Sequence, residues 1–464
     1  MAVILAYTSP ALGHLYPFCA LLRELAGRGH QVHVRTLADG VQLCRDLGFE
    51  ADAVDARIES LHNEDSVGGV LRAAGETVRA LAACAAVEVG DIGRAVRQVA
   101  PDLVIVDSNC WGAISFAEAE NLAFVVFSAF TPYLRSPGSP PFGPGARPWP
   151  GPLGRVRDWG VGLVTGAVFD RPFRRGMRAV RAGLGLPDVR SADDLLRRAP
   201  AVLVATGKPF EYPHTDWGPS VAMIGPAPFD PPRAQTPAWL HDIEDPVVLV
   251  TTSSVPQADD RLIRTAVEAL AGQGLHLVAT SPARTVPAAG HGPGVTLTEF
   301  VPHSLVLERA VCVVTHGGMG VTQKALNRGI PVCAVPFGRD QFEVARRVEM
   351  ARCGVRLPAR QLSPTTLRAA VAAAMSMADG AAAVARGFAA TGGVRRGADI
   401  VESMLGQPGS GERVAAAGEQ GRPGPDRGSD QPRSNVVVSA TDRRCPGGSG
   451  SPTVDGPIRT NTCG

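Results

Sequence analysis

Several features are missing from this 464-residue sequence, and each absence excludes a class of protein. None of its nine cysteines has the Cys-x-x-Cys spacing of a zinc or redox site, so we expect buried, reduced thiols in a cytoplasmic protein. No apolar stretch reaches the ~18 residues that cross a bilayer, and no basic segment typical of a signal peptide precedes the first strand. Because the net charge is only +2 and no long basic run is present, nucleic acid is not an expected partner.

Apolar strands alternate with amphipathic helices along most of the chain, which is typical of α/β domains with parallel sheets. The dinucleotide fingerprint Gly-x-Gly-x-x-Gly is absent from the Rossmann-like beginning. With 45% hydrophobic residues, the chain can build two sizeable cores. We predict a first domain over 1–226, a proline-rich linker over 227–245, a second domain over 246–405 and a disordered tail over 406–464.

The most informative stretch follows a predicted buried strand at 310–314. It reads Thr-His-Gly-Gly-Met-Gly, with the histidine at His316, and continues into a predicted helix and a second apolar strand. In such βαβ units ligands bind beyond the carboxyl ends of the strands, and the free N–H groups of a helix start favour a phosphate. The ring of His316 could donate to the same phosphate. A glycine turn that only serves close packing has the same appearance, so the residues alone leave both interpretations open.

Two polar residues of the first domain also follow predicted strands, His14 after 2–7 and Asp107 after 103–106. We expect both to lie in the ligand crevice, where the carboxylate can fix the tautomer of the imidazole. The dipole of the first helix should disfavour imidazolium, which leaves His14 neutral as a general base. A His14 that caps a turn and an Asp107 that caps the helix near Cys110 or Trp111 are the alternatives.

The motifs between His316 and Gln341 resemble the nucleotide-sugar signature of the GT-B glycosyltransferases, especially the actinobacterial enzymes that decorate natural products. Gly13-His14, with the later Arg-Gly-His-x-Val, resembles that family's amino-terminal motif. The resemblance covers roughly residues 1–405 and implies the GT-B fold, with two Rossmann-like domains facing a cleft. A last helix is predicted to end at residue 405, in a helical stretch over about 381–405, and the resemblance implies that it packs back on the first domain. It implies an inverting hexosyltransferase that moves a hexose or deoxyhexose from a UDP- or dTDP-sugar to a hydroxyl of an apolar natural product, polyketide or lipid-like acceptor.

The resemblance also assigns site residues. His14 would be the general base with Asp107 as its partner, and Asp340 and Gln341 would bind sugar hydroxyls, although Asp340 could instead only cap the following helix. The expected donor site comprises Ser253, Ser254, Phe300, His303, His316, Gly318, Met319, Gly320, Val321, Lys324, Asp340 and Gln341. The acceptor pocket is expected to be lined by Tyr133, Phe142 and Trp149, from the segment 131–160, which is rich in proline and glycine and is predicted to be a loop.

Some positions depart from the family pattern. Lys324 stands where the family usually has a Glu that binds the ribose hydroxyls, Phe300 replaces a Trp, and His303 replaces a Gln. Since a deoxyribose lacks the 2′-hydroxyl, a dTDP-sugar fits Lys324, and a UDP-sugar stays open. The same change leaves the alternative of a non-catalytic nucleotide-sugar binder or an auxiliary partner of another transferase. Glu343, where relatives often have Asn, is a smaller departure.

The expected partners are the nucleotide sugar and the apolar acceptor. No tightly bound cofactor or metal is expected, because no Asp-x-Asp motif is present and His316 with the helix N–H groups can take a cation's role. Residues 160–178 interleave apolar residues with arginines and are predicted to form an amphipathic helix. A lid, a core helix and a weak contact with a membrane surface all fit this pattern. The protein is expected to be a monomer or homodimer.

Overall fold

The computed structural model describes residues 1–62, 70–231, 236–253, 259–281 and 290–405. The seven cysteines in this part of the chain are buried and free, as expected for reduced thiols. Ser254 and the tail predicted over 406–464 lie outside the described residues. Two seven-stranded sheets organise the rest, so the expected pair of Rossmann-like α/β domains is confirmed, while their exact boundaries stay a prediction.

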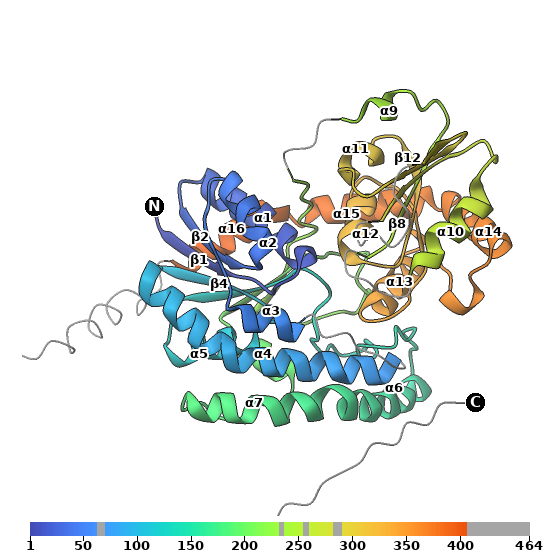
Figure 1. Cartoon of the computed structure of the whole chain (residues 1–464). Helices are drawn as coiled ribbons and strands as arrows, with labels where there is room; N and C mark the ends of the chain where they lie inside the picture. The colour runs from blue at the N-terminus through green and yellow to red at the C-terminus, as the bar shows by residue number, and fades with distance from the viewer. Residues whose placement is uncertain (63–69, 232–235, 254–258, 282–289, 406–464) are drawn as a thin grey trace, which may run out of the picture. The chain divides into compact units, whose positions relative to one another are not determined.

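The first sheet is parallel throughout and has the order β3-β2-β1-β4-β5-β6-β7 (Figure 1). Its strands are β1 Val3–Tyr7, β2 Gln31–Thr36, β3 Glu50–Ala53, β4 Leu103–Asp107, β5 Phe124–Ser128, β6 Ala201–Val204 and β7 Val221–Met223. Because β1 pairs with β2 on one side and β4 on the other, the strand order reverses between β1 and β4. Ligands bind at such a reversal in open parallel sheets.

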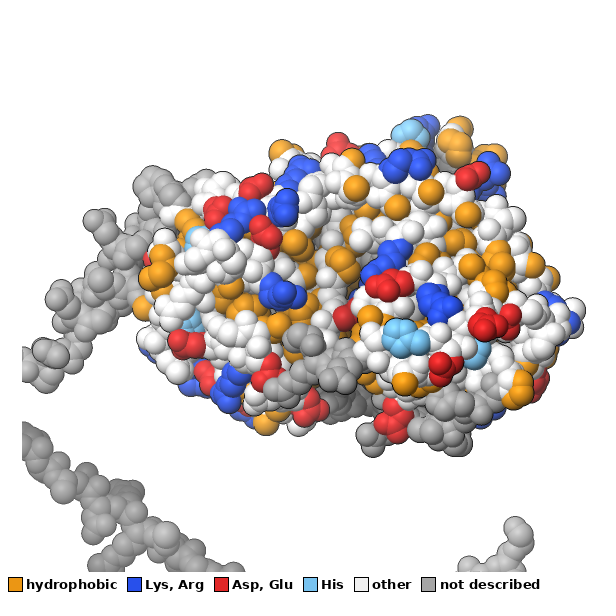
Figure 2. All heavy atoms as spheres, turned by 90° about the horizontal axis from the view of Figure 1, so that it is seen from above, with side chains coloured by type: hydrophobic (Ala, Val, Ile, Leu, Met, Phe, Trp, Pro, Cys, Tyr) orange, Lys and Arg blue, Asp and Glu red, His pale blue; other side chains and the backbone are white. Residues whose placement is uncertain are grey.

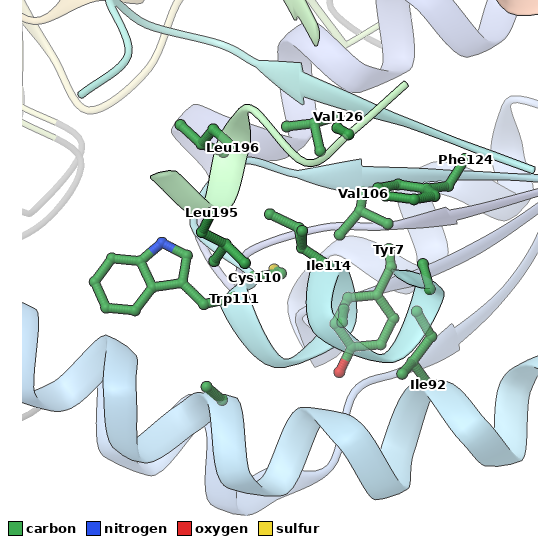
Figure 3. Packing of buried hydrophobic residues seen from close by; sticks show 14 of the residues in the cluster. Tyr7, Ile92, Val106, Cys110, Trp111, Ile114, Phe124, Val126, Leu195 and Leu196 are labelled. Carbon is green, nitrogen blue, oxygen red and sulfur yellow. The ribbon is translucent and has the colours of Figure 1, made fainter. Parts of the chain in front are cut away.

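Helices cover both faces of this sheet. The helices of this domain are α1 Leu12–Gly27, α2 Ala38–Asp46, α3 Ala56–His62, α4 Val70–Val99, α5 Trp111–Ala119, α6 Pro152–Thr165, α7 Arg171–Gly183 and α8 Ala192–Leu196, and all of them except α6 contribute residues to the cores on the two faces. Successive strand residues point to opposite faces. Tyr7 and Val106 therefore pack with Trp111 beneath α4 and α5 (Figure 3), while Ile4 and Ile105 pack beneath α1.

The segment predicted as a loop over 131–160 is shorter than expected, because α6 already begins at Pro152. Proline suits the first turn of a helix, where its fixed φ helps and its missing N–H is not needed. Helix α6 continues through one π-helical turn, Gly166–Asp170, into α7 (Figure 1). The proline and glycine content of the segment therefore concealed a helix start.

The second sheet has the order β10-β11-β9-β8-β12-β13-β14, and all described pairs except β10 with β11 are parallel. Its strands are β8 Val247–Thr251, β9 His276–Thr280, β10 Gly290–Gly292, β11 Val295–Thr298, β12 Ala310–Thr315, β13 Val332–Ala334 and β14 Gly354–Arg356. The helices are α9 Ala238–His241, α10 Asp260–Leu270, α11 His303–Leu307, α12 Met319–Leu326, α13 Gln341–Met350, α14 Pro364–Met375, α15 Ala378–Ala390 and α16 Gly393–Met404. The order reverses between β8 and β12, which places the candidate donor turn at that point.

The long terminal helix predicted over 381–405 is broken into α15 and α16. Gly392 stands at the break with φ +88, a conformation that favours glycine. After the break α16 packs on the first domain, where Ala398 and Val401 join the core beneath α1. The guanidinium of Arg28 adds hydrogen bonds to Asp399 and Glu402, both at 2.7 Å.

Among the described helices, none by itself has the length and apolar content to cross a membrane. Only the bent combination of α14 with the stretch Ala378–Met404, which turns by 59°, meets those criteria. The face shown in Figure 2 has Lys and Arg side chains beside Asp and Glu, without a continuous basic stripe. That face therefore lacks the electrostatic character of a nucleic-acid groove.

Candidate active site

The candidate residues lie where the strand order reverses in each sheet. His14 is in the first turn of α1, which follows β1, and Asp107 is the last residue of β4. In the second domain His316 follows β12, and Ser253 follows β8 with its N–H donating to Asp259 at 2.7 Å. Parallel strands present their carboxyl ends at one edge of the sheet, so each pair converges on one crevice.

The His14 ring and the Asp107 carboxylate are in direct contact. Nδ1 of His14 is 2.8 Å from Oδ2 of Asp107, whose side chain is completely buried. The other carboxylate oxygen accepts the Asn109 N–H at 2.8 Å, so this carboxylate is held at both oxygens. With Nδ1 donating to Asp107, the lone pair of Nε2 is the basic atom of the ring. The geometry that a His–Asp dyad needs is therefore present.

The pKa of His14 is shifted in the opposite direction to the sequence expectation. Burial alone lowers the pKa of the ring, but the adjacent Asp107 carboxylate, with a further contribution from Asp340, raises it above its ordinary value. The helix dipole was expected to dominate and does not, because a carboxylate in contact with the ring is a stronger field source than a helix end. A base that works in its neutral form then loses activity below a raised pKa.

Helix α5 is capped by Glu88 rather than by Asp107. The carboxylate of Glu88, which belongs to α4, accepts the N–H groups of Gly112 at 2.8 Å and Ala113 at 3.3 Å. Burial raises the pKa of Glu88 to about 8; its two hydrogen bonds oppose this, and Asp107 and Asp91 add to it. The capping alternative for Asp107 is thus wrong. Glu88 stands on the same face of α4 as the buried residues Ala85 and Ile92, and this spacing was the local signal for a buried acid.

A chain of aromatic rings links the dyad to the predicted acceptor residues. Phe130 meets the His14 ring edge-on at 5.4 Å between centroids and lies 5.9 Å from Tyr133. Tyr133 in turn contacts Phe142 at 4.7 Å and Phe169 at 6.2 Å. The structure therefore brings Tyr133 and Phe142 together beside the dyad. Phe130 connects them and was not singled out from the sequence.

Trp149 lies apart from these rings. Its side chain is exposed and holds the guanidinium of Arg157 at 5.6 Å from the ring centroid, at the start of α6. Among the described ring contacts it has none with Tyr133 or Phe142. The acceptor role predicted for Trp149 therefore has no support from its position.

His316 is buried with an unsatisfied ring nitrogen. Its Nδ1 has no hydrogen-bond partner within the described residues. Burial lowers the pKa of His316 to about 4, opposed by a hydrogen bond with the Thr251 backbone and assisted by the charge of Arg339. Gly318 is required beside the ring, since a β-carbon there would stand 2.5 Å from Nε2. With its proton on Nδ1, the neutral imidazole can donate to a ligand in this turn.

The start of α12 offers backbone N–H groups to an anion. The helix begins after Gly318, and no side chain caps it. The side chain of Met319 is buried in the core of the second domain, so this residue presents only its backbone to the turn. A β-carbon on Gly320 would meet nothing within 4 Å, which leaves open space at the helix start. Val321 packs against the same core. Gly320 is therefore the point at which an anion can approach the helix start.

Asp340 occupies the position before α13 without capping it. Its backbone is helical, and its side chain makes no capping hydrogen bond, which contradicts the capping alternative. Burial raises the pKa of Asp340, against the nearby charges of His14 and Arg339. Gln341 instead accepts the N–H groups of Phe337 and Gly338 at 2.8 and 3.0 Å through its side-chain oxygen. Asp340 is thus presented toward the dyad by a turn that Gln341 holds.

Arg339 is a second residue that the sequence analysis did not select. It has φ +54, an uncommon conformation for a residue with a β-carbon, which is often retained at functional turns. Its charge acts on His62, whose pKa burial lowers to about 4 with help from His14 and Arg339. The same charge acts on His316, so Arg339 supplies positive potential between the two domains' candidate residues.

Within the described residues, no three His, Cys, Asp or Glu side chains are grouped to hold a metal.

The three larger departures from the family pattern, at Lys324, His303 and Phe300, take different positions. Lys324 is neutralised by an ion pair with Asp230, which lies in the predicted linker. His303 is hydrogen-bonded to Thr280 at 3.3 Å, and burial with the charge of Lys324 lowers its pKa to about 4. Phe300 is 52% exposed, so its ring face is accessible for stacking. The cation at Lys324 is therefore compensated rather than free.

Glu343 connects the acceptor segment to the donor-side helix α13. Its Oε1 accepts the N–H groups of Gly143 and Gly145, each at 2.9 Å. Its other oxygen accepts from Arg347 at 2.8 Å, and Arg347 also donates to the buried Glu211 at 2.6 Å. Gly145 has φ +59, and a β-carbon there would lie 2.1 Å from the Phe342 carbonyl. The loop and the helix thus fit closely only with glycine at this position.

Replacing Glu343 with Ala should raise the KM for the acceptor by about tenfold to 100-fold, since two charge-assisted hydrogen bonds to the loop are lost. The donor KM should change little. The fold should persist because Arg347 keeps Glu211 as its counter-ion. Steady-state kinetics with each substrate varied in turn, beside the exposed Glu268→Ala variant, measure the effect. An unchanged acceptor KM would show that this connection does not position the loop.

Known proteins resemble this chain over most of its length. Residues 264–391 match the family described as erythromycin biosynthesis protein CIII-like, C-terminal domain. The 4'-demethylrebeccamycin synthase of Lentzea aerocolonigenes is 28% identical over 430 residues, covering 87% of this chain and 100% of that protein. Among solved structures, the glycotransferase of kitacinnamycin has a TM-score of 0.69 at 24% identity over 87% of this chain and 99% of its own. The glycosyltransferase VinC, solved in complex with dTDP, has a TM-score of 0.65 at 21% identity over 87% and 99%. These likenesses confirm the expected GT-B fold.

Proposed function

We propose that this chain, which has the GT-B fold and resembles glycosyltransferases of natural-product pathways, transfers a hexose or deoxyhexose from a UDP- or dTDP-sugar to a hydroxyl of an apolar small molecule, with inversion. The observation that carries the proposal is the 2.8 Å contact between His14 and Asp107 at the strand-order reversal of the first sheet. An enzyme with this contact has a base in place. The alternative of a non-catalytic binder would not need it.

In the proposed reaction the acceptor hydroxyl gives its proton to Nε2 of His14 as its oxygen attacks the anomeric carbon. The bond from that carbon to the diphosphate breaks on the opposite side, so the configuration inverts. Asp107 remains ionised and stabilises the imidazolium through Nδ1. The electrostatic pairing of His14 with Asp107 that raises its pKa is the same interaction that stabilises this product of the proton transfer.

The departing diphosphate would gain negative charge at the start of α12. Three groups can stabilise it there: the uncapped N–H groups that follow Gly318, the ring of His316, and the charge of Arg339. We propose that these groups are sufficient without a divalent cation. Asp340 lies close enough to His14 to influence its pKa, so a sugar held by Asp340 would be beside the base.

The acceptor is proposed to rest against the rings of Phe130, Tyr133 and Phe142. These side chains form a continuous apolar wall that begins at His14. Aromatic walls of this kind favour a flat or extended apolar molecule, with one hydroxyl directed at the base. For the donor base, the exposed ring of Phe300 offers a stacking face. The compensated charge of Lys324 supports a thymidine diphosphate donor, and VinC is a fold relative solved with that nucleotide.

Thermal unfolding of the full chain with UDP, dTDP, GDP and ADP should separate these donors. A nucleotide at 100 times its dissociation constant adds about 2.7 kcal/mol to the free energy of unfolding. We expect dTDP or UDP to stabilise the protein, and GDP and ADP to have little effect. The His316→Ala variant should lose most of that stabilisation, since His316 lies in the phosphate turn.

The matched control is His241→Ala, which removes an exposed histidine of α9. It should respond to nucleotides as the unmodified protein does. Stabilisation by none of the four nucleotides, or equal stabilisation of His316→Ala, would contradict the proposed donor site.

A further inference from the structure

The exposed apolar side chains of this protein are concentrated on one helix. Eight large hydrophobic residues are mostly exposed among the described residues, and six of them lie between 149 and 164. Leu153 and Trp159 are 70% and 68% exposed. A contiguous apolar patch of this kind marks a binding surface rather than a random distribution. The six are Trp149, Leu153, Val156, Trp159, Leu163 and Val164.

The five residues on α6 form one stripe. At 100° per residue, Leu153, Val156, Trp159, Leu163 and Val164 occupy an arc of about 140° around the helix axis. The opposite side of α6 carries Gly154, which is buried against the Trp149 carbonyl, and Gly162, where a β-carbon would lie 3.8 Å from the Pro141 ring of the acceptor loop. The stripe therefore faces away from the contact with the rest of the domain.

The helical run that begins with α6 carries a strong positive charge, most of it on α7. Residues 152–183, which span α6, the π-helical turn and α7, contain seven arginines and two aspartates, a net charge of +5 compared with +2 for the whole chain. Four of the arginines are exposed on α7, and Arg174 and Arg178 share a single counter-ion, Asp188, at 3.4 and 3.6 Å. The exposed four are Arg171, Arg174, Arg175 and Arg178.

We propose that α6 and α7 dock this protein on an anionic membrane surface, with the apolar stripe of α6 in the headgroup–acyl boundary and the arginines of α7 on lipid phosphates. A tryptophan among aliphatic side chains, with arginines alongside, is the composition that lies in such an interface. A second copy of this chain would bring its own four exposed arginines of α7 against these, so like charges would oppose that contact.

The surface is continuous with the proposed acceptor pocket. Phe169, in the turn between α6 and α7, contacts Tyr133 of the aromatic wall. A β-carbon on Gly143, in the same loop as Phe142, would lie 3.3 Å from the Phe169 ring. Resting on the proposed function, this continuity means that an apolar acceptor dissolved in the bilayer would reach His14 along the same helix. The acceptor class is then one that partitions into membranes.

Sedimentation of the full chain with vesicles tests the docking without requiring activity. The protein should bind vesicles of mixed phosphatidylcholine and phosphatidylglycerol, bind phosphatidylcholine vesicles much less, and dissociate as salt is raised. Removing two charges with Arg174→Gln and Arg175→Gln should weaken binding by about 30-fold. Trp159→Ser with Leu163→Ser should weaken it by at least about tenfold.

The matched control is the pair Arg264→Gln and Arg360→Gln, which removes two exposed charges from the second domain and should leave vesicle binding unchanged. The proposal would be overturned if this control pair lost as much vesicle binding as the Arg174→Gln, Arg175→Gln protein. It would also be overturned if the unmodified protein did not bind anionic vesicles. Self-association that disappears in the Trp159→Ser, Leu163→Ser protein would overturn it as well, because the stripe would then belong to a second copy. Nucleotide stabilisation measured on the same samples reports separately on the proposed function.

Discussion

The His14→Ala enzyme should lose about 10²-fold to 10⁴-fold in kcat, the usual contribution of a positioned general base. Its affinity for the nucleotide should be unchanged, because His14 belongs to the first domain and the candidate phosphate turn lies in the second. The measurement combines initial rates with the dTDP or UDP stabilisation described above. A variant with undiminished kcat would remove His14 from the mechanism.

The pH dependence of kcat/KM in the Asp107→Asn enzyme tests whether Asp107 raises the pKa of His14. In the unmodified enzyme kcat/KM should fall below the raised pKa of His14 as the ring takes up a proton. Asparagine removes the carboxylate charge that raises this pKa, so the falling limb should move to lower pH while kcat drops by about 10³-fold to 10⁴-fold. The exposed His241→Ala variant should keep the original profile. If kcat/KM of the Asp107→Asn enzyme fell at the same pH as in the unmodified enzyme, a group other than His14 would cause the fall.

Stability should depend on pH through Glu88. The pKa of this buried carboxyl is about 8 in the folded protein, above the ordinary 4.5 that applies when the chain unfolds. A raised folded-state pKa contributes stability that is fully present below pH 4.5 and is lost as pH rises to 8. Between pH 6 and pH 8 the loss should be about 2–3 kcal/mol, at 1.36 kcal/mol per pKa unit.

Glu88→Gln should flatten this dependence and should be more stable than the unmodified protein above pH 8. The amide oxygen can still accept the Gly112 and Ala113 N–H groups, and no charge has to be buried. Urea unfolding at a series of pH values measures the slope, with the exposed Glu120→Gln variant as the control. Parallel curves for the Glu88→Gln and unmodified proteins would contradict the assignment of the slope to this group.

The sequence identified the turns of the site well because the relevant signals are local. An apolar strand followed by a polar residue, as at Asp107 and His316, places that residue at a carboxyl end of the sheet. The contact between His14 and Asp107 followed from this rule and from the family resemblance, and the structure has it at 2.8 Å. The same logic gave the two parallel sheets.

The parts that sequence reasoning missed depend on distant partners or on competing signals. Glu343 contacts Gly143, which is 200 positions away in the sequence, and no local sequence pattern predicts such a contact. The raised pKa of His14 required knowing that a carboxylate, not the helix end, is its nearest charge. Pro152 lies in a segment whose proline content favoured a loop, although proline is also common in the first turn of a helix. The adjacent glycines Gly392 and Gly393 mark the helix break, since glycine readily adopts the positive φ that both have.

Helix α16 has a consequence for how the protein is made. Its Gly397 approaches Leu21 and Ile224 closely, so the last helix of the described chain completes the core of the domain that is synthesised first. On the ribosome the first domain must therefore wait for nearly the whole polypeptide before it can close. During that time the part of α1 that α16 covers stays exposed to solvent, which favours aggregation. The core of the domain that leaves the exit tunnel first is therefore completed by the last helix of the described chain.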